Sequence, residues 1–156
     1  ELLRFTKRNF PGEPFSAVPL PELLEELGAR VKEDCEANGI KFSLSTKRLT
    51  VRAKRSALFS VLFNLVFNAI EHAECTEISV RAEKSGERVF LKVTDNGKGL
   101  SDNARIFEPY FTGNESDDNS GLGLFIVKSE TEAMGGTIAY SGKNGSTFTL
   151  SLLSEF

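Results

Sequence analysis

The sequence predicts an α+β fold, a two-layer sandwich in which helices cover one face of a mixed, mostly antiparallel sheet. Some segments repeat apolar residues with helical spacing, and others alternate apolar and polar residues as half-buried strands do. Consecutive strands joined by tight turns pair antiparallel, and the apolar face of such a sheet needs helices to cover it. A long polar stretch without periodicity, from Asp95 to Ser120, indicates a functional loop.

The composition is that of one globular domain of 156 residues, with 40% hydrophobic and 26% charged residues. A net charge of -3 offers no basic surface for nucleic acid, so no nucleic-acid partner is expected. Cys35 and Cys75 are too few for a zinc site, and thiols outside a disulfide framework indicate a reducing, cytoplasmic environment. Whether a longer protein is anchored in a membrane stays open.

The N-terminal residues divide into a helix-like segment and a breaker. Residues 1–10 have helical spacing, and Pro11-Gly-Glu-Pro14 ends any helix. We therefore expect residues 1–14 to be the end of a preceding helix and a linker, and residues 15–156 to form the domain.

An amphipathic helix and two short strands come next. The helix begins with Leu20 and Pro21 and ends near Asn38-Gly39, because Pro favours helix starts and Gly favours helix ends. Alternation over residues 40–45 predicts a half-buried strand, and a short strand is expected around Leu49 to Val51.

The central helix, Leu58 to His72, is apolar on almost every side and is therefore expected to be buried. Asn64, Asn68 and His72 follow each other at four-residue steps, so their side chains form one stripe. A buried amide without a partner costs on the order of 1–3 kcal/mol, so the two asparagines need partners. Those partners are either protein groups or a ligand.

The second half of the chain contains two pairs of strands and one helix. Residues 78–82 and 89–93 alternate on either side of Ser85-Gly86, which predicts a hairpin. A helix is expected after Gly121 and ends at Gly135-Gly136. Two strands complete the sheet, residues 137–140 and 146–153.

Three short motifs within or beside the polar stretch allow two readings each. Asp95-Asn-Gly-Lys-Gly99 is either a tight turn or a place where backbone approaches a flat ligand and the carboxylate accepts a hydrogen bond. Gly121-Leu-Gly123 is an ordinary helix start or an anion site. The aromatic cluster Phe107-Glu-Pro-Tyr-Phe111 is a small core that holds the loop, part of a site, or both.

Together with Asn64-Leu-Val-Phe-Asn68-Ala, these motifs resemble, in order and spacing, the N, G1, F and G2 boxes of the catalytic ATP-binding domain of sensor histidine kinases. That domain belongs to the Bergerat-fold superfamily shared with gyrase, MutL and the ninety-kilodalton heat-shock chaperone. The resemblance covers about residues 15–153 and implies an ATP-binding fold in which residues 101–120 form the ATP lid.

The resemblance also implies roles for individual residues. Asp95 would bind the adenine amino group with help from Thr147, and Asn68 would hold Mg²⁺ at the phosphates. The remaining residues implied to contact the nucleotide are Asn64, His72, Gly97, Gly99, Leu100, Gly121, Leu122, Gly123 and Leu124. Phe107 and Phe111 would anchor the lid.

Position 64 separates relatives with different activities. Superfamily members that hydrolyse ATP resemble one another in carrying Glu there as general base, whereas this chain has Asn64. Because an amide does not take a proton from water, the γ-phosphate is expected to be kept for another acceptor. Two departures from the family pattern, Glu71 and an acidic lid with residues such as Asp117, predict weak, Mg²⁺-dependent nucleotide binding.

The resemblance implies an enzyme that phosphorylates a histidine on a dimerisation domain of the same protein, from which an aspartate of a response regulator is then phosphorylated. His72 is a pocket residue in this reading, so the acceptor lies elsewhere. The chain alone is expected to be monomeric and the full-length protein a homodimer. A serine kinase of the anti-sigma type and a non-catalytic nucleotide-sensing module are the alternatives.

Overall fold

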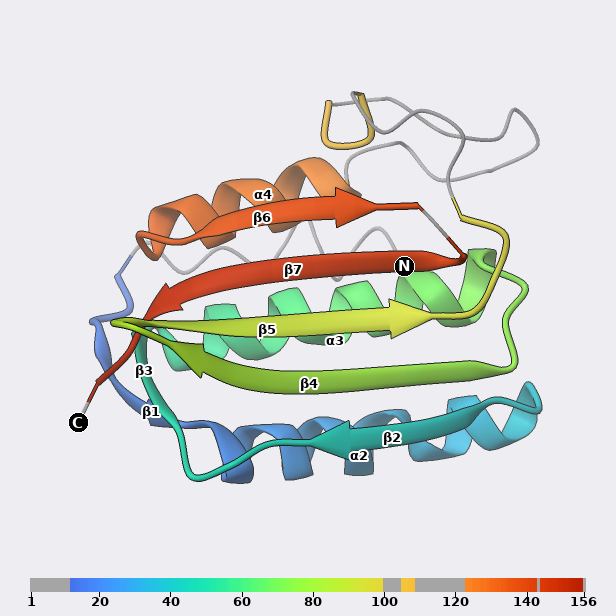
Figure 1. The fold of residues 1–156 in the computed structure, drawn as a ribbon, viewed down its shortest axis with the longest axis horizontal. Coiled ribbons are helices and arrows are strands. Elements are labelled where there is room, and N and C mark those ends of the chain that lie inside the picture. The colour runs from blue at the N-terminus through green and yellow to red at the C-terminus, as the bar shows by residue number, and fades with distance from the viewer. Residues whose placement is uncertain (1–11, 100–104, 109–122, 143, 156) are drawn as a thin grey trace.

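The fold is a five-stranded sheet with three helices packed against one face (Figure 1). The computed structural model describes residues 12–99, 105–108, 123–142 and 144–155. The helices are α2 (Leu20–Ala37), α3 (Arg55–His72) and α4 (Gly123–Ala133). The strands of the sheet are β2 (Lys41–Ser45), β4 (Glu77–Ser85), β5 (Arg88–Asp95), β6 (Thr137–Ser141) and β7 (Ser146–Leu153).

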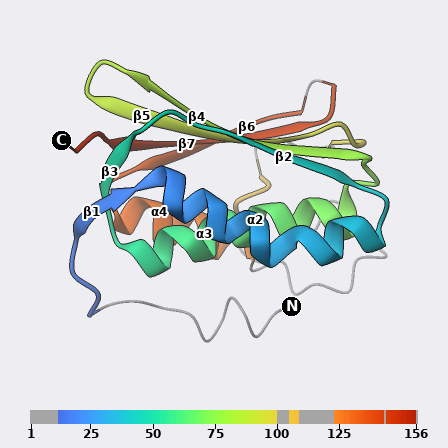
Figure 2. The ribbon, with the colours of Figure 1, turned by 90° about the horizontal axis from the view of Figure 1, so that it is seen from below.

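Figure 2 shows the two layers directly, with all three helices on the same side of the sheet. The strand order is β2-β4-β5-β7-β6. Only β2 and β4 are parallel, because the chain crosses over through α3 between them, and the other neighbours are antiparallel. The predicted fold class, a two-layer sandwich with a mostly antiparallel sheet, is confirmed.

One small sheet was not predicted. Strand β1 (Ser16–Pro19) pairs antiparallel with β3 (Thr50–Ala53), and this pair is separate from the five-stranded sheet. The expectation of one sheet is therefore corrected. Strand β1 gives little signal in the sequence because it is four residues long, contains Pro19 and buries only Val18.

Helix α3 is the centre of the core, as its apolar sequence predicts. It lies between α2 and α4 under the sheet, and residues such as Leu58, Leu62 and Val66 are fully buried. Strands β4, β5 and β7 turn alternate residues toward it, which gives the sheet its apolar face.

The first turn of α3 is capped from a distant part of the chain. The Glu13 carboxylate accepts hydrogen bonds from the backbone N–H groups of Ser56, at 2.8 Å, and Ala57, at 3.3 Å. These are N–H groups that a helix start leaves without partners, and a negative charge there interacts favourably with the helix dipole. Glu13 therefore attaches the segment expected to be a linker to the helix that carries Asn64.

Replacing Glu13 with Ala is expected to lower the free energy of unfolding by about 1 kcal/mol, the usual cost of losing a helix cap. The comparison variant is Glu25→Ala, because Glu25 is an exposed acid on α2. Urea denaturation measures both variants. Equal stabilities for the two would show that the Glu13 contact contributes nothing to the fold.

Residues 1–11 lie outside the described residues, so the boundary expected between residues 14 and 15 stays a prediction. Of the helices in the part of the chain that the structure describes, none is long and apolar enough to cross a membrane.

Candidate functional site

Segments far apart in the sequence meet at one end of the molecule. Figure 1 shows the last residues of β5, the last turns of α3 and the first residues of β7 at this end, and α4 begins on the side that faces it. Asp95 ends β5, Ser146 begins β7, and the stripe that starts at Asn64 occupies the second half of α3. The sheet topology thus gathers most of the motifs that the sequence analysis identified.

Asp95 is a buried carboxylate at the end of a strand. Its side chain accepts hydrogen bonds from the backbone N–H groups of Gly97, at 2.8 Å to Oδ1, and Ser146. Burial raises the pKa of the Asp95 carboxyl above its usual range, and these two hydrogen bonds oppose the shift. A carboxylate has about four acceptor positions, so Asp95 retains capacity to bind a ligand donor.

The loop after Asp95 is both a turn and a structural connection. Asn96 Oδ1 accepts hydrogen bonds from the N–H groups of Thr76, at 2.8 Å, and Glu77, at 3.0 Å, which ties the end of β5 to the start of β4. The Asn96 amide also donates to the Thr76 hydroxyl at 2.8 Å. Asn96 therefore fixes the position of Asp95 and is not needed to contact a ligand.

The two glycines of this loop allow close approach to other parts of the backbone. A Cβ atom on Gly97 would lie 2.0 Å from the carbonyl oxygen of Ala73, at the end of α3. Gly99 has a φ of +74° and packs against the carbonyl oxygens of Gly142 and Gly145. Both glycines are required by the protein itself, whatever their part in binding a base.

Thr147 is not the residue opposite Asp95, so the structure does not support the helping role that the resemblance implies for it. In the pairing of β5 with β7, Asp95 is opposite Ser146 and Thr94 is opposite Thr147, whose hydroxyl oxygens are 3.3 Å apart. Successive side chains of a strand point to opposite faces, so Thr147 is on the other face of the sheet. Ser146 is the hydroxyl residue next to Asp95.

Ser146 was missed by the sequence analysis, together with the glycine before it. The Ser146 hydroxyl is buried and lies 3.1 Å from the Tyr140 hydroxyl. Gly145 has a φ of +101°, and a Cβ atom there would lie 2.1 Å from the Asp95 carbonyl oxygen. The Gly145-Ser146 pair at the start of the last strand is the sequence feature that could have indicated both residues as part of the site.

Cys75 is a further neighbour that the sequence did not indicate. Burial, followed by the neighbouring charge of Asp95, raises the pKa of the Cys75 thiol to about 11. The thiol therefore stays protonated at neutral pH and is unreactive. Its part at this end of the molecule is to fill space beside the carboxylate.

The stripe on α3 becomes more accessible along its length. Asn64 is 4% exposed, Asn68 is half-buried, and the His72 side chain is 31% exposed. The Asn64 amide donates a hydrogen bond to Ser60 Oγ at 3.3 Å, but its buried Oδ1 has no partner among the described residues. The Asn68 side chain also makes no hydrogen bond within the described part of the chain.

Part of the aromatic cluster is described, and it packs on the core. Ile106 is buried, and the Phe107 ring makes an edge contact with Phe148 of β7, with 6.2 Å between ring centroids. The Lys128 ammonium lies 5.8 Å from the Phe107 ring centroid. The sequence hypothesis that this cluster holds the loop is supported at residues 105–108.

Several predicted site residues lie outside the described residues, namely Leu100, Phe111, Gly121 and Leu122. The same is true of the acidic part of the lid. Gly123 and Leu124 are described, and they form the start of α4, where both are half-buried and Leu124 packs against the core.

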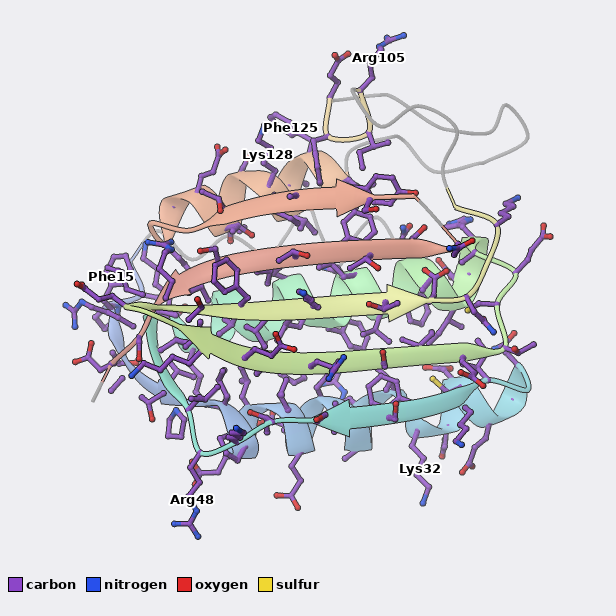
Figure 3. All side chains as sticks on the ribbon, viewed as in Figure 1. Phe15, Lys32, Arg48, Arg105, Phe125 and Lys128 are labelled. Atoms are coloured by element: carbon purple, nitrogen blue, oxygen red, sulfur yellow. The ribbon has the colours of Figure 1, made fainter. Side chains whose placement is uncertain are left out.

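Three cations near the predicted site, Lys98, Arg105 and Lys128, are candidate phosphate ligands, and each has an acidic neighbour. Lys98 Nζ is 3.3 Å from Glu74, Arg105 Nε is 3.2 Å from Glu108, and Lys128 Nζ is 3.9 Å from Glu132. Figure 3 shows Arg105 pointing away from the sheet. These pairs are exposed and therefore weak, and none of them directs its cation to a ligand.

The geometry defines a class of protein, a two-layer α/β sandwich with a ligand site at one end of its sheet. An acceptor carboxylate forms one part of the site, amide side chains on a buried helix form the second, and a glycine helix start forms the third. The sequence profile of the family described as histidine kinase-, DNA gyrase B-, and HSP90-like ATPase matches residues 53–155. The chain belongs to this family, and the ATP-binding class predicted from the sequence is confirmed.

Individual relatives agree with the family assignment. The sensor histidine kinase ZraS of Escherichia coli strain K12 is 37% identical over 141 residues, which are 86% of this chain and 30% of ZraS. The solved catalytic domain of histidine kinase ThkA has a TM-score of 0.80 at 30% identity and covers 90% of this chain and 97% of that one. Full-length ShkA, solved with AMPPNP, has a TM-score of 0.82 at 26% identity over 98% of this chain and 34% of that one.

Proposed function

We propose that this chain is the ATP-binding catalytic part of a sensor histidine kinase and that it transfers the γ-phosphate of ATP to a histidine outside it. The observation that carries the proposal is the buried Oδ1 of Asn64, which has no hydrogen-bond partner among the described residues and lies on the same helical stripe as Asn68. An acceptor oxygen without a partner is costly in a protein interior, and a bound nucleotide complex supplies what it lacks. The chain spans only 30% of ZraS, so the rest of the kinase is expected in other segments.

The residues present fit a Mg²⁺ ion at the phosphates. Mg²⁺ prefers oxygen ligands and usually takes few of them from protein, with phosphates and water completing its shell. Asn68 would hold the ion through its amide oxygen, which no described residue occupies. When bound, the ion supplies charge neutralisation at the phosphates, which is most of what phosphoryl transfer requires.

Asp95 would select the base. An ionised carboxylate accepts a hydrogen bond from the exocyclic amino group of adenine but repels the carbonyl oxygen that guanine carries at that position. We transfer the supporting role first given to Thr147 to Ser146, because its backbone N–H holds the Asp95 carboxylate in place. Gly97 and Gly99 fix the loop that presents Asp95.

Asn64 would keep hydrolysis slow. A general base must accept a proton, which a carboxylate does and an amide does not. Ser60 is the only described hydrogen-bond partner of the Asn64 side chain, and a serine hydroxyl is no base either. Water in the site therefore stays unactivated, and the γ-phosphate remains available to an incoming acceptor.

The expected acceptor is a histidine on a dimerisation domain of the same protein. This chain contains one histidine, His72, which belongs to the α3 stripe and whose Nε2 lies 3.8 Å from Glu71. A response regulator is the second expected partner, and the relative ThkA has been solved in complex with the response regulator protein TrrA. The full-length protein is proposed to be a homodimer, with this part of it in the cytoplasm.

Replacing Asn68 with Ala is expected to abolish phosphotransfer because it removes the proposed metal ligand. Mutation of a residue that only hydrogen-bonds to a metal ligand typically lowers metal affinity or activity by roughly 10- to 100-fold. Removal of the ligand itself should lower phosphotransfer activity by more than this. The assay mixes the chain with a separately supplied histidine-bearing dimerisation domain, labelled ATP and Mg²⁺. The matched control is Asn38→Ala, at an exposed asparagine at the end of α2.

Three outcomes of this assay would contradict the proposal. Label on serine would indicate a kinase of the anti-sigma type. Nucleotide binding by calorimetry without transfer of label would indicate a sensing module. Full activity of Asn68→Ala would remove the metal-binding role given to that residue.

A further inference from the structure

A hollow separate from the proposed nucleotide site lies between α2 and β2, at the edge of the sheet opposite β6. Its volume is about 500 Å³. We call it the α2–β2 hollow, and its lining residues include Gly28, Lys32, Cys35, Glu36, Ile40, Lys41 and Phe42. Its floor is thus mostly apolar, and its rim carries charged side chains.

Strand β2 presents free backbone groups beside this hollow. It is the last strand on its side of the sheet and pairs only with β4. The Lys41 N–H donates to the Thr76 carbonyl at 2.8 Å, and in a parallel ladder every second residue bonds to the neighbouring strand. Phe42 and Leu44 therefore direct their N–H and C=O groups away from β4, toward solvent.

This edge has few of the features with which proteins normally prevent strand pairing. Natural edge strands are blunted by proline, bulges, inward charges or a covering segment. Strand β2 has no proline, pairs with β4 in regular register over five residues and carries one charge, Lys41, at its first position. In Figures 1 and 2, α2 runs beside β2 and leaves its outer edge uncovered by other described elements.

Apolar side chains of β2 lie between this edge and α2. Gly28 lies within α2 and has no side chain where Leu44 approaches the helix, since a Cβ atom at Gly28 would lie 3.1 Å from Leu44 Cδ1. Leu44 is 38% exposed, a large apolar side chain partly open to solvent at the edge. An apolar side chain of an added strand would pack against Leu44 and Phe42 and enter the hollow.

The charges around the hollow favour an acidic occupant. Lys32 and Lys41 outnumber Glu36, the acid that lines the hollow, although the chain as a whole has a net charge of -3. None of these three forms a salt bridge within the described residues. Figure 3 shows Lys32 extending away from the body, and Arg48, in the connection that follows β2, extends on the same side.

We infer that β2 and the α2–β2 hollow form a docking site for an extended, acidic peptide segment of a partner protein. The segment adds a strand to β2 through the backbone groups of Phe42 and Leu44 and places alternate apolar side chains over the hollow, with Lys32 at its rim. Its carboxylates then lie on the opposite face, where the Lys41 side chain points. This mode of recognition takes affinity from main-chain hydrogen bonds and specificity from the neighbouring pocket. It does not depend on nucleotide binding.

The test is a nuclear magnetic resonance titration of the isotope-labelled chain with an acetylated, amidated hexapeptide, Val-Glu-Val-Glu-Val-Thr. Amide shifts are expected at Phe42 and Leu44. Leu44→Pro should weaken binding at least about tenfold, equivalent to about 1.4 kcal/mol, because it removes an outward N–H and leaves the pairing with β4 intact. Leu44→Ala is the control that shortens the side chain but keeps the N–H.

Charge reversal provides a second, independent measurement. Lys32→Glu combined with Lys41→Glu should weaken binding of the glutamate peptide and favour the same peptide with lysine in place of glutamate. The inference is overturned if millimolar peptide shifts neither Phe42 nor Leu44, or if Leu44→Pro folds and binds as the parent does. Shifts in β2 that depend on protein concentration without peptide would instead indicate pairing of two copies.

Discussion

Asp95→Asn is expected to lower the affinity for ATP by about 10- to 150-fold, because hydrogen bonds to charged groups contribute roughly 1.5–3 kcal/mol. The substitution keeps the shape of the side chain but replaces one acceptor oxygen with an NH₂ donor. That donor faces the adenine amino group unfavourably and the guanine carbonyl oxygen favourably. Discrimination between ATP and GTP should therefore largely disappear, which calorimetry with both nucleotides measures.

The pH dependence provides a control for this prediction. Burial raises the pKa of Asp95, so its proton is taken up at a higher pH than for an exposed aspartate. ATP affinity is expected to fall as the pH drops through this raised pKa, because protonation removes the acceptor. In the Asn variant this pH dependence should be absent. Unchanged ATP selectivity, or an unchanged pH profile, would remove the role given to Asp95.

Gly97→Ala is expected to destabilise the fold by about 3 kcal/mol, the upper part of the usual range for forcing an extra methyl group into a packed site. The added Cβ atom would lie 2.0 Å from the Ala73 carbonyl oxygen, a backbone atom that cannot rotate away. To remove this clash, the loop must move away from the end of α3, which breaks the 2.9 Å hydrogen bond from the Lys98 N–H to the Ala73 carbonyl oxygen. Nucleotide binding should be lost with it, since Asp95 is held by the same loop.

Thermal unfolding measures this effect as a decrease in melting temperature of about 6–12 °C for a chain of this size. The matched control is Gly12→Ala, because a Cβ atom at Gly12 meets no atom within 4 Å. Gly12→Ala should leave the melting temperature nearly unchanged. If both variants melt at the same temperature as the parent, the close approach of the loop to Ala73 is not a feature of the protein in solution.

Local patterns in the sequence were sufficient for most of the architecture. The helices α2, α3 and α4, the β4–β5 hairpin and the strands β6 and β7 all lie where periodicity and turn residues place them. These signals are reliable because they depend on neighbours within a few residues. Strand β1 had no such signal, since its residues pair with residues of β3 that are 31 to 37 positions away and most of its side chains are exposed.

The sequence did not show which hydroxyl residue, Ser146 or Thr147, lies beside Asp95 in the site. Both are hydroxyl residues at the start of β7, and composition does not distinguish them. The choice depends on register, because a shift of one residue moves a side chain to the other face of a sheet. The pairing of Asp95 with Ser146 joins residues about fifty positions apart, and only the folded sheet sets it.

The sequence by itself determined the family and the order of the elements other than β1, and it predicted candidate nucleotide-binding residues, because these follow from residue type and short-range spacing. The tertiary structure alone decided which of those residues meet. It placed Ser146 beside Asp95, left Asn64 Oδ1 without a partner among the described residues and set Glu13 on the first turn of α3. The physical reason is that cross-strand register, burial and helix capping depend on contacts between distant segments, which form only when the sheet and its helices pack together.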